Sequence, residues 1–212
     1  MAETLVEIGD TTYRVTHPAA ADALIDEKEF ARDERLPYWA DIWPSAVALA
    51  RSLARCNPEA LVGRRVVELG CGVGLPSMIA IAGGARVTST DHYEAALDFV
   101  LYNASVNLGS LKPETRLLDW HAPQTEGLGP FDLVLAADVL YESRNVPALA
   151  VLIPNLVTPS GEVLVADPRR KDTPVFLERM RGMGFEPSTE ECLVTLDGRE
   201  VGVVIHRLRR CS

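Results

Sequence analysis

Cysteine is scarce in this sequence, and its spacing is uninformative for metal or redox chemistry. The chain has four cysteines among 212 residues, and no two of them form a C-x-x-C pair. This argues against a zinc ribbon and against a thioredoxin-like motif. The four histidines also lack the spacing of zinc ligands, so we expect no metal site. Scattered cysteines are typical of reduced thiols, and we expect a cytosolic protein.

Long apolar runs and an excess of positive charge are lacking as well. No uncharged apolar stretch reaches the roughly 18 residues of a membrane helix, and the first ten residues do not resemble a signal peptide. The 30 acidic and 21 basic side chains give a net charge of -9, which disfavours binding to phosphate backbones. We therefore expect neither a membrane nor a nucleic acid as partner. Two short basic runs, residues 169–171 and 207–210, are expected to be solvated surface.

What the chain does contain is a regular alternation of short apolar runs and helical patterns. With 47% hydrophobic and 24% charged residues, its composition is that of an ordinary globular protein. The patterns predict strands at 65–69, 86–90, 116–118, 131–136 and 161–166, and helices from 43–44 onward and at 76–82, 93–107, 146–156 and 174–183. Two short strands around Gly9 precede them, and Asp197-Gly198 predicts a final hairpin over 192–207.

This order of elements predicts an α/β fold. We expect a Rossmann-like, doubly wound, seven-stranded and mostly parallel sheet, with helices on both faces and an antiparallel C-terminal edge hairpin. Residues 37–212 are expected to form the main domain. Residues 1–36 are expected to be an N-terminal extension, in which the charged stretch 22–34 forms either a loosely packed helix or a lid.

The first predicted strand of the alternating region runs into a glycine-rich loop. The loop reads Gly70-Cys-Gly72-Val-Gly74, and glycines between a strand and a helix let the backbone turn sharply and approach a ligand closely. Asp91 ends the next strand, where an acidic side chain can bind ribose hydroxyls. The spacing is G-x-G-x-G and not the G-x-G-x-x-G of dinucleotide sites, and Glu68 stands just before it. A carboxylate there suits the positively charged S-adenosylmethionine better than NAD.

These residues resemble a known family. VVELGCGVG at 66–74, together with Asp91, is similar to the first cofactor motifs of the class I, seven-β-strand S-adenosylmethionine-dependent methyltransferases. Three further segments resemble methyltransferase family 16, which includes many protein lysine methyltransferases: PYWADIWPS at 37–45, LDW at 118–120 and AADVLYE at 136–142. PYWADIWP and DPRR at 167–170 also resemble the branch that methylates the β subunit of the electron-transfer flavoprotein. The similarity spans residues 37–185.

The resemblance implies a role for each motif residue. The expected contacts of S-adenosylmethionine are Trp43, Glu68, Gly70, Gly72, Gly74, Asp91, Asp119, Trp120 and Ala137. Of these, Asp91 would hold the ribose, Asp119 the adenine amino group, and Trp120 would cover the adenine ring. Trp43 would lie over the pocket, whereas Trp39 either packs or joins the site.

Asp138 and Tyr141 are the expected catalytic residues. Both follow a central strand, at the edge where open α/β sheets bind ligands. A partly exposed Asp138 would orient a lysine amine by a charge-assisted hydrogen bond, and Tyr141 would form a wall by cation–π contact.

The function we predict is methyl transfer from S-adenosylmethionine to a lysine side chain of a protein partner, by a monomer. Three alternatives remain open. One is an N-methyltransferase for a small amine or pyridine-type molecule. Another is a non-catalytic binding module with this fold, and the last is an NAD-dependent oxidoreductase.

Overall fold

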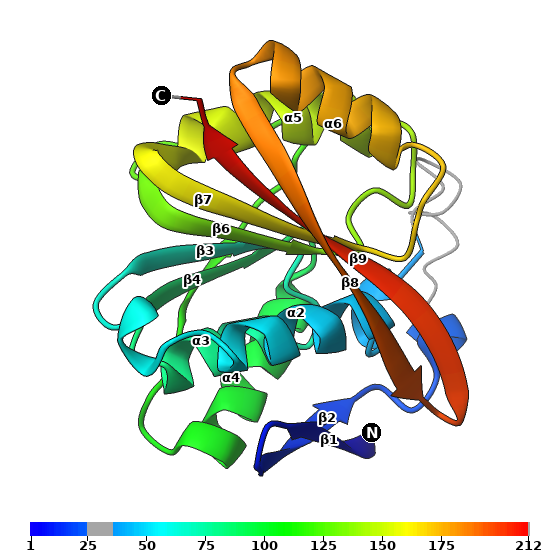
Figure 1. Ribbon diagram of the computed structural model, residues 1–212. Helices are drawn as coiled ribbons and strands as arrows, with labels where there is room; N and C mark the ends of the chain where they lie inside the picture. The colour runs from blue at the N-terminus through cyan, green and yellow to red at the C-terminus, as the bar shows by residue number, and fades with distance from the viewer. Residues whose placement is uncertain (25–35, 212) are drawn as a thin grey trace.

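A computed structural model describes residues 1–24 and 36–211 and contains the predicted α/β architecture (Figure 1). The main sheet has seven strands in the order β5-β4-β3-β6-β7-β9-β8. Five of them are parallel, and β9 runs antiparallel to both β7 and β8. The predicted fold class, including the antiparallel edge hairpin, is confirmed. The strands are β3 (Arg65–Leu69), β4 (Arg86–Asp91), β5 (Glu114–Leu117), β6 (Phe131–Ala137), β7 (Val157–Asp167), β8 (Phe185–Leu196) and β9 (Arg199–Arg210).

Helices cover both faces of the sheet and make three layers. α2 (Pro44–Ala54), α3 (Leu75–Ala82) and α4 (Glu94–Leu108) lie on one face, and α5 (Asn145–Leu156) and α6 (Thr173–Gly182) lie on the other. Side chains alternate between these two layers because successive residues of a strand point to opposite faces. In β3, Val66 belongs to the core under α2 and α3, whereas Val67 belongs to the core under α5 and α6. Both are fully buried.

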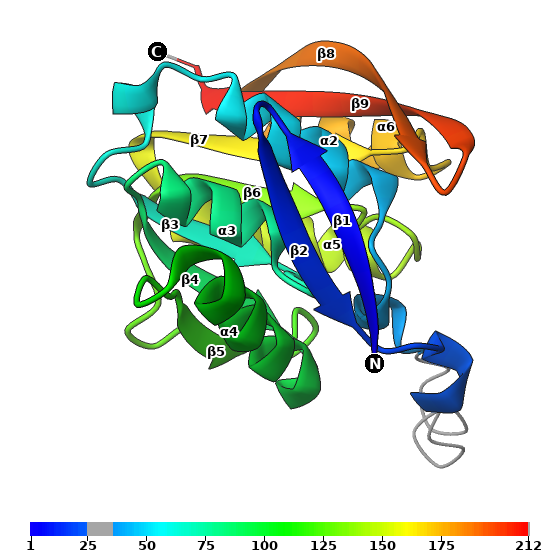
Figure 2. The same cartoon turned by 90° about the horizontal axis from the view of Figure 1, so that it is seen from below.

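An N-terminal hairpin covers the outer side of the α2–α4 layer (Figure 2). It consists of β1 (Ala2–Ile8) and β2 (Thr11–His17), the two strands predicted around Gly9. Asn103 of α4 holds it: the Asn103 side chain accepts from Thr16 N at 2.9 Å and donates to Thr16 O at 2.9 Å. Apolar residues of the hairpin, Val15 among them, share the core of α2 and α3. The predicted division at residue 36 stays a prediction, and most of the predicted lid, 25–34, lies outside the described residues.

Three short 3-10 helices complete the description: η1 (Ala21–Leu24), η2 (Tyr38–Ala40) and η3 (Pro58–Ala60). η2 leads directly into α2, which begins at Pro44 with Trp43 as the residue before it. Proline suits the first helical position because its missing N–H has no partner to lose there. In the part of the chain that the structure covers, no helix has both the length and the apolar character needed to cross a membrane.

The last three strands are longer than predicted. β7 begins at Val157 rather than at 161, and both strands of the final hairpin are 12 residues long. The half of β8 that the pattern missed contains Glu186, Glu190 and Glu191, all exposed. β8 is an edge strand, and charged side chains are a common protection for such an edge.

One basic run is not simply solvated, in contrast to our expectation. Arg207 and Arg209 of β9 both form ion pairs with Glu162 of the neighbouring strand β7. Arg210 lies over the ring of Phe185, with its guanidinium carbon 4.7 Å from the ring centroid. These contacts tie the terminal hairpin to the sheet and engage all three guanidinium groups.

Candidate active site

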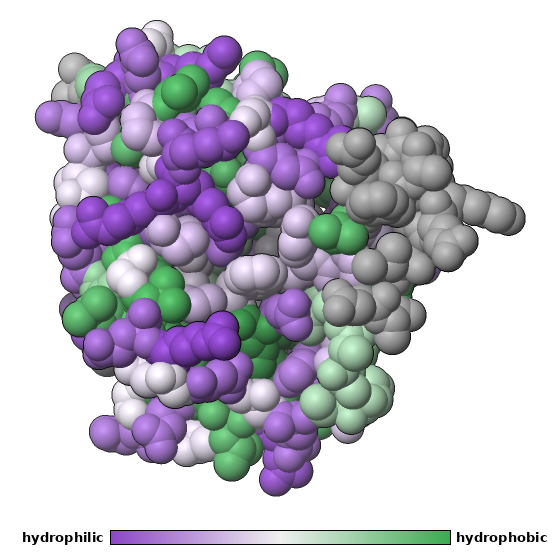
Figure 3. Space-filling model, turned by 90° about the vertical axis from the view of Figure 1, so that its right-hand side faces the viewer, coloured by the Kyte–Doolittle hydropathy of each residue, from purple (hydrophilic) through white to green (hydrophobic). Residues whose placement is uncertain are grey.

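A cavity of about 290 Å³ opens at the carboxyl edge of the parallel strands, at the lower end of the range for ligand sites. β3 lies there between β4 and β6, so the strand order reverses at this point. Open α/β sheets bind ligands at such a reversal. Figure 3 looks onto this side of the molecule, where paler and apolar surface lies between hydrophilic areas.

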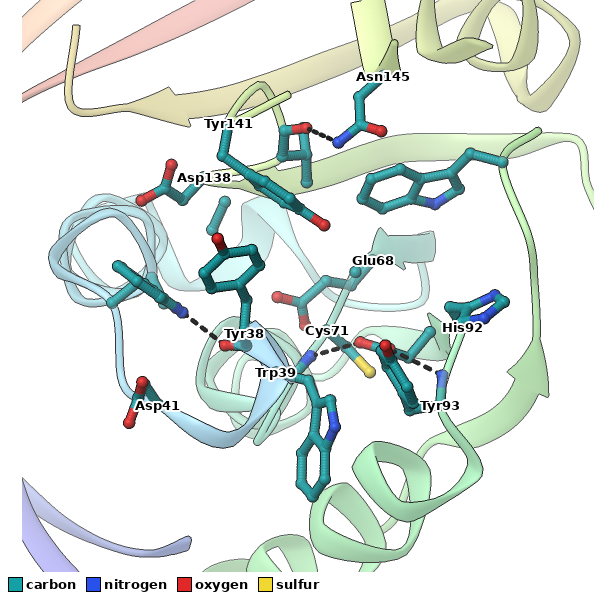
Figure 4. Close-up of a pocket in the computed structure, with 18 of the residues that line it drawn as sticks. Tyr38, Trp39, Asp41, Glu68, Cys71, His92, Tyr93, Asp138, Tyr141 and Asn145 are labelled. Carbon is teal, nitrogen blue, oxygen red and sulfur yellow. Dashed lines mark hydrogen bonds between the residues drawn. The ribbon is translucent and has the colours of Figure 1, made fainter. Parts of the chain in front are cut away.

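Ten of the eleven predicted site residues line this cavity. They are Trp43, Glu68, Gly70, Gly72, Asp91, Asp119, Trp120, Ala137, Asp138 and Tyr141. They come from the residue just before α2, from β3, β4 and β6, and from the loops after β3, β5 and β6. Figure 4 shows how several of them surround the same space.

Gly74 is the predicted residue that does not line the cavity. It has a φ of +85°, and a Cβ built on it would lie 2.8 Å from a methyl carbon of Val100 in α4. Glycine is therefore required there by the left-handed backbone and by the close approach of α4. Its predicted cofactor contact stays a prediction, and the geometry gives a packing reason for the residue.

Asp91 lies beside the glycine loop, and both of its carboxylate oxygens accept backbone hydrogen bonds. Its Oδ2 accepts from Gly72 N at 3.0 Å, and its Oδ1 accepts from Tyr93 N at 3.1 Å (Figure 4). A carboxylate has about four lone-pair sites, so Asp91 can still accept from a further donor. Burial raises the pKa of Asp91 to about 6, even though these backbone hydrogen bonds act to lower it.

The Glu68 side chain forms hydrogen bonds within the protein that the sequence did not predict. The residue is 1% exposed, and its Oε2 accepts from both Ser77 N at 2.9 Å and Ser77 Oγ at 2.5 Å. Burial raises the pKa of Glu68 to about 8, against the opposing effect of the Ser77 hydrogen bonds. One carboxylate oxygen thus stabilises the start of α3, while the side chain still borders the cavity.

Asp119 and Trp120 lie together at one end of the cavity. Asp119 Oδ1 accepts from His121 N at 2.9 Å, and Asp119 Oδ2 is 3.8 Å from His92 Nδ1. The indole ring of Trp120 contacts the glycine loop so closely that a Cβ on Gly70 would be 2.9 Å from it. Trp120 Nε1 is buried, and none of the residues that the structure describes accepts a hydrogen bond from it.

Three aromatic side chains enclose the opposite end. The rings of Tyr38 and Tyr141 meet edge to face, with centroids 4.9 Å apart, and Trp43 lies 6.0 Å from Tyr38 (Figure 4). Trp43 Nε1 donates to Tyr38 O at 2.7 Å, which fixes η2 against the start of α2. Partial removal from water and the nearby Glu142 carboxylate raise the pKa of Tyr141, so it remains a neutral phenol. Trp39, the residue left open, packs 5.5 Å from Phe99 and also lines the cavity.

Asp138 is held differently from what we predicted. The residue is 7% exposed and thus buried, whereas we expected it to be partly exposed. Arg170 donates two hydrogen bonds to its carboxylate, from Nε to Oδ1 at 2.9 Å and from Nη2 to Oδ2 at 3.0 Å. The expectation that Arg170 belongs to a solvated basic run is wrong. The hydrogen bonds to Asp138 raise the pKa of the guanidinium further. The backbone of Asp138 is left-handed, with a φ of +54°, which few residues adopt without support from their surroundings.

Two residues that line the cavity near Tyr141 and Asp138 were not predicted as site residues from the sequence. Tyr38 stood within the PYWADIWPS motif, so an aromatic signal was present but unassigned. Arg170 stood within DPRR, and its partner Asp138 is 32 positions away in the chain. Only the parallel neighbours β6 and β7 bring the two together.

The cavity fits S-adenosylmethionine in its chemistry. Its lining includes carboxyl groups that can accept from hydroxyl, amino and positively charged groups, and an indole ring that can cover a flat base; one buried indole N–H has no acceptor among the described residues. Among the described residues, no group of three or more histidine, cysteine or acidic side chains is arranged to hold a metal ion.

Comparison with known proteins places the chain. A family model described as lysine methyltransferase (Methyltransf_16) matches residues 30–183, more than half of its length. The chain belongs to this lysine methyltransferase family. The family assignment agrees with the resemblance of the 37–45 and 136–142 motifs, which both fall within the matched region.

Individual relatives of the family match the same part of the chain. The electron transfer flavoprotein beta subunit lysine methyltransferase of Xenopus laevis is 34% identical over 138 residues, covering 63% of this chain and 53% of that protein. The protein N-lysine methyltransferase METTL21A of Danio rerio is 36% identical over 140 residues, covering 62% and 61%. The chain spans little more than half the length of these curated relatives.

A solved structure with the same fold is the N-methyltransferase NodS of Bradyrhizobium japonicum in complex with S-adenosyl-L-homocysteine. Its TM-score is 0.64 at 16% identity, covering 91% of this chain and 98% of NodS. At that identity the likeness concerns the fold.

Proposed function

We propose that this protein is an S-adenosylmethionine-dependent methyltransferase that acts on the side-chain amine of a lysine in a protein. One observation carries the proposal: the residues suited to the cofactor and those suited to a lysine line a single cavity at the strand-order reversal. Membership of the lysine methyltransferase family and the printed activities of the relatives support the same acceptor.

The cofactor-holding end is the part around the glycine loop. Asp91 would accept hydrogen bonds from the ribose hydroxyls, and Asp119 would accept one from the adenine amino group. The face of Trp120 would cover the adenine ring. Glu68 and the close backbone at Gly70 and Gly72 would face the positively charged part of the molecule. When bound, S-adenosylmethionine supplies a methyl group on a sulfonium, which is already activated for direct displacement.

The acceptor end is the part enclosed by Tyr38, Trp43 and Tyr141. A lysine amine has an ordinary pKa near 10.4, so only about one in a few thousand is neutral at pH 7. Aromatic walls bind the ammonium form by cation–π contact, and their desolvation favours release of a proton to water. Asp138 would orient the amine. Each of its oxygens already accepts from Arg170 but has a second lone pair for a substrate N–H.

The protein itself therefore aligns the nucleophile and keeps water away from it. The N–CH3 bond forms as the S–CH3 bond breaks, so no covalent intermediate with the protein is needed. We further propose that the enzyme works as a monomer in the cytosol and that its partner is a protein rather than a nucleic acid. The net charge of -9 supports this choice of partner, because it disfavours polyanions.

The test begins with cofactor binding. Isothermal titration should give micromolar affinity for S-adenosylmethionine and no measurable affinity for NAD. The purified protein is then incubated with a protein extract and S-adenosylmethionine carrying a labelled methyl group, and the products are separated by size. Label in the macromolecular fraction is expected. Label confined to small amines would favour the small-molecule N-methyltransferase, and cofactor binding without any transfer would favour a binding module.

A further inference from the structure

Asn145 lines the cavity and has no part in the chemistry described so far. It is the first residue of α5, and it is 3% exposed. A buried amide needs partners for both its nitrogen and its oxygen, and those partners show what the side chain holds in place. Figure 4 shows Asn145 beside Tyr141, on the side of the cavity formed by the loop after β6.

The Asn145 amide nitrogen holds the loop of the acceptor end. Its Nδ2 donates to Val139 O at 3.0 Å (Figure 4). Val139 directly follows Asp138, whose backbone is left-handed, and it comes two residues before Tyr141. The Asn145 amide also acts on Tyr141 itself, where it works against the rise in the pKa of the buried phenol. One side chain therefore supports the backbone that carries both expected catalytic residues.

The Asn145 amide oxygen faces the loop after β5. Its Oδ1 is 3.2 Å from Nε2 of His121. Because the amide nitrogen already donates to Val139 O, the amide oxygen is the acceptor and the ring nitrogen is the donor. His121 directly follows Trp120, the residue expected to cover the adenine ring. The Asn145 amide thus joins the loop of the cofactor end to the loop of the acceptor end.

An apolar contact reinforces this connection. A Cβ on Gly70 would lie 2.9 Å from the Trp120 ring and 3.5 Å from a methyl carbon of Val139, so both side chains lie against the same glycine. Val139 is buried in the core on the α5 side of the sheet, and Trp120 packs against that core. The position of Val139, and with it that of Asp138, is therefore set in part from the cofactor end.

We propose that Asn145 is a positioning residue for methyl transfer: its amide fixes the loop after β6 against the loop after β5, and this aligns the lysine amine with the methyl group of the bound cofactor. The inference rests on the proposed function. It assigns to Asn145 an effect on the rate of transfer rather than on cofactor affinity, because a small displacement of the reacting groups costs much in rate.

The decisive variant is Asn145→Asp, which keeps the size of the side chain and an oxygen for His121 but loses the donor to Val139 O. Initial rates of tritiated methyl incorporation into a protein extract are measured with the full chain at varied S-adenosylmethionine concentration. At pH 8 the apparent kcat should fall roughly 10- to 100-fold, while KM and the calorimetric Kd for S-adenosylmethionine should change less than about threefold.

The pH profile of Asn145→Asp separates positioning from a general loss of structure. As the pH is lowered from 8 to 5, the loss relative to the wild type should shrink, because a protonated carboxyl group can again donate to Val139 O. Burial of the new carboxyl group favours that protonation. The ratio to the wild type is used because His121, Tyr141 and Glu142, which lie nearby, titrate in both proteins.

Asn155→Asp is the matched control within the same helix. Asn155 is exposed, and its Nδ2 likewise donates to a backbone carbonyl, Val151 O, at 2.8 Å. This variant should keep the wild-type kcat at every pH. His121→Ala removes the other partner of the Asn145 amide from an exposed position and should lower the apparent kcat about three- to tenfold. Added to Asn145→Ala, it should cause little further loss, because both changes break one connection.

The outcomes separate this inference from the proposed function. A wild-type kcat in Asn145→Asp would overturn the inference, as would a KM that rises in step with the loss, or a loss of equal size at pH 5 and pH 8. If urea unfolding shows that Asn145→Asp does not fold, His121→Ala decides, and an unchanged kcat in that variant would overturn the inference. Each of these results leaves lysine methylation standing. A wild-type enzyme that labels no lysine would overturn the proposed function and this inference with it.

Discussion

Arg170 holds both oxygens of Asp138 from a loop 32 positions further along the chain. Both residues line the cavity, and the two hydrogen bonds from the guanidinium fix the orientation of the carboxylate. The planar fork of Arg170 matches the carboxylate in a way that a lysine cannot reproduce.

Replacing Arg170 should impair transfer without impairing cofactor binding. Arg170→Gln leaves Asp138 as a buried charge with fewer partners, so we expect kcat/KM for the protein acceptor to fall about 50-fold, on the order of 2 kcal/mol. Arg170→Lys keeps the charge and should recover part of that loss. Affinity for S-adenosylmethionine, measured by calorimetry, should change less than twofold. A large loss of that affinity would contradict a role confined to the acceptor end.

Asp91 should carry cofactor affinity. Asp91→Asn removes a charged acceptor from the cavity, and we expect the Kd for S-adenosylmethionine to rise at least about tenfold. Because the pKa of Asp91 is about 6, wild-type affinity should also weaken as the pH falls below that value. Asp98→Asn is the matched control on the exposed side of α4 and should bind like the wild type. An unchanged Kd in Asp91→Asn would remove this residue from the cofactor site.

Gly74 should matter for stability rather than for ligand contact. In Gly74→Ala the new methyl group meets Val100 with the backbone still at a φ of +85°, so we expect a loss of roughly 2–3 kcal/mol in the free energy of unfolding. Val100→Ala in the same chain should restore part of it by making room. Urea unfolding gives the stability, and calorimetry on the folded fraction gives the affinity. Lost affinity at full stability would instead support the cofactor contact predicted from the motif.

Glu68 should make the stability of the ligand-free protein depend on pH. Its folded pKa of about 8 lies above its ordinary 4.5, so the folded state binds the proton more tightly than the unfolded state does. The resulting stabilisation is present at low pH and is lost as the pH rises through 8. Relative to Glu68→Gln, the wild type should lose on the order of 4 kcal/mol between about pH 5 and about pH 9. Glu178→Gln, on the exposed side of α6, should follow the wild type at every pH; parallel curves for all three proteins would refute the assignment.

The sequence predicted the fold well where the burial pattern is strong. β3 was placed from Arg65 to Leu69 and is found there, because its apolar run is flanked by clear turn signals. The first half of β8 was missed, since a strand at the sheet edge needs no alternating apolar face. Local patterns report burial, and they do not report backbone pairing at an exposed edge.

The site was predictable where one motif brings its residues together. The glycine loop follows β3 and Asp91 ends β4, and the fold class predicts that these two strands are neighbours. The Asp138–Arg170 pair was not predictable in the same way, because no local pattern connects residues so far apart in the chain. The packing role of Gly74 depends on the approach of Val100, which is likewise a tertiary property.

The most direct test of the account identifies the amino acid that receives the methyl group. Protein extract is labelled with the enzyme and S-adenosylmethionine carrying a tritiated methyl group, then hydrolysed to amino acids and resolved by chromatography. We expect the enzyme-dependent label to co-migrate with methylated lysine and, at S-adenosylmethionine concentrations below the wild-type Kd, to fall at least about tenfold with Asp91→Asn. Label on arginine, on histidine or on no amino acid at all would contradict it.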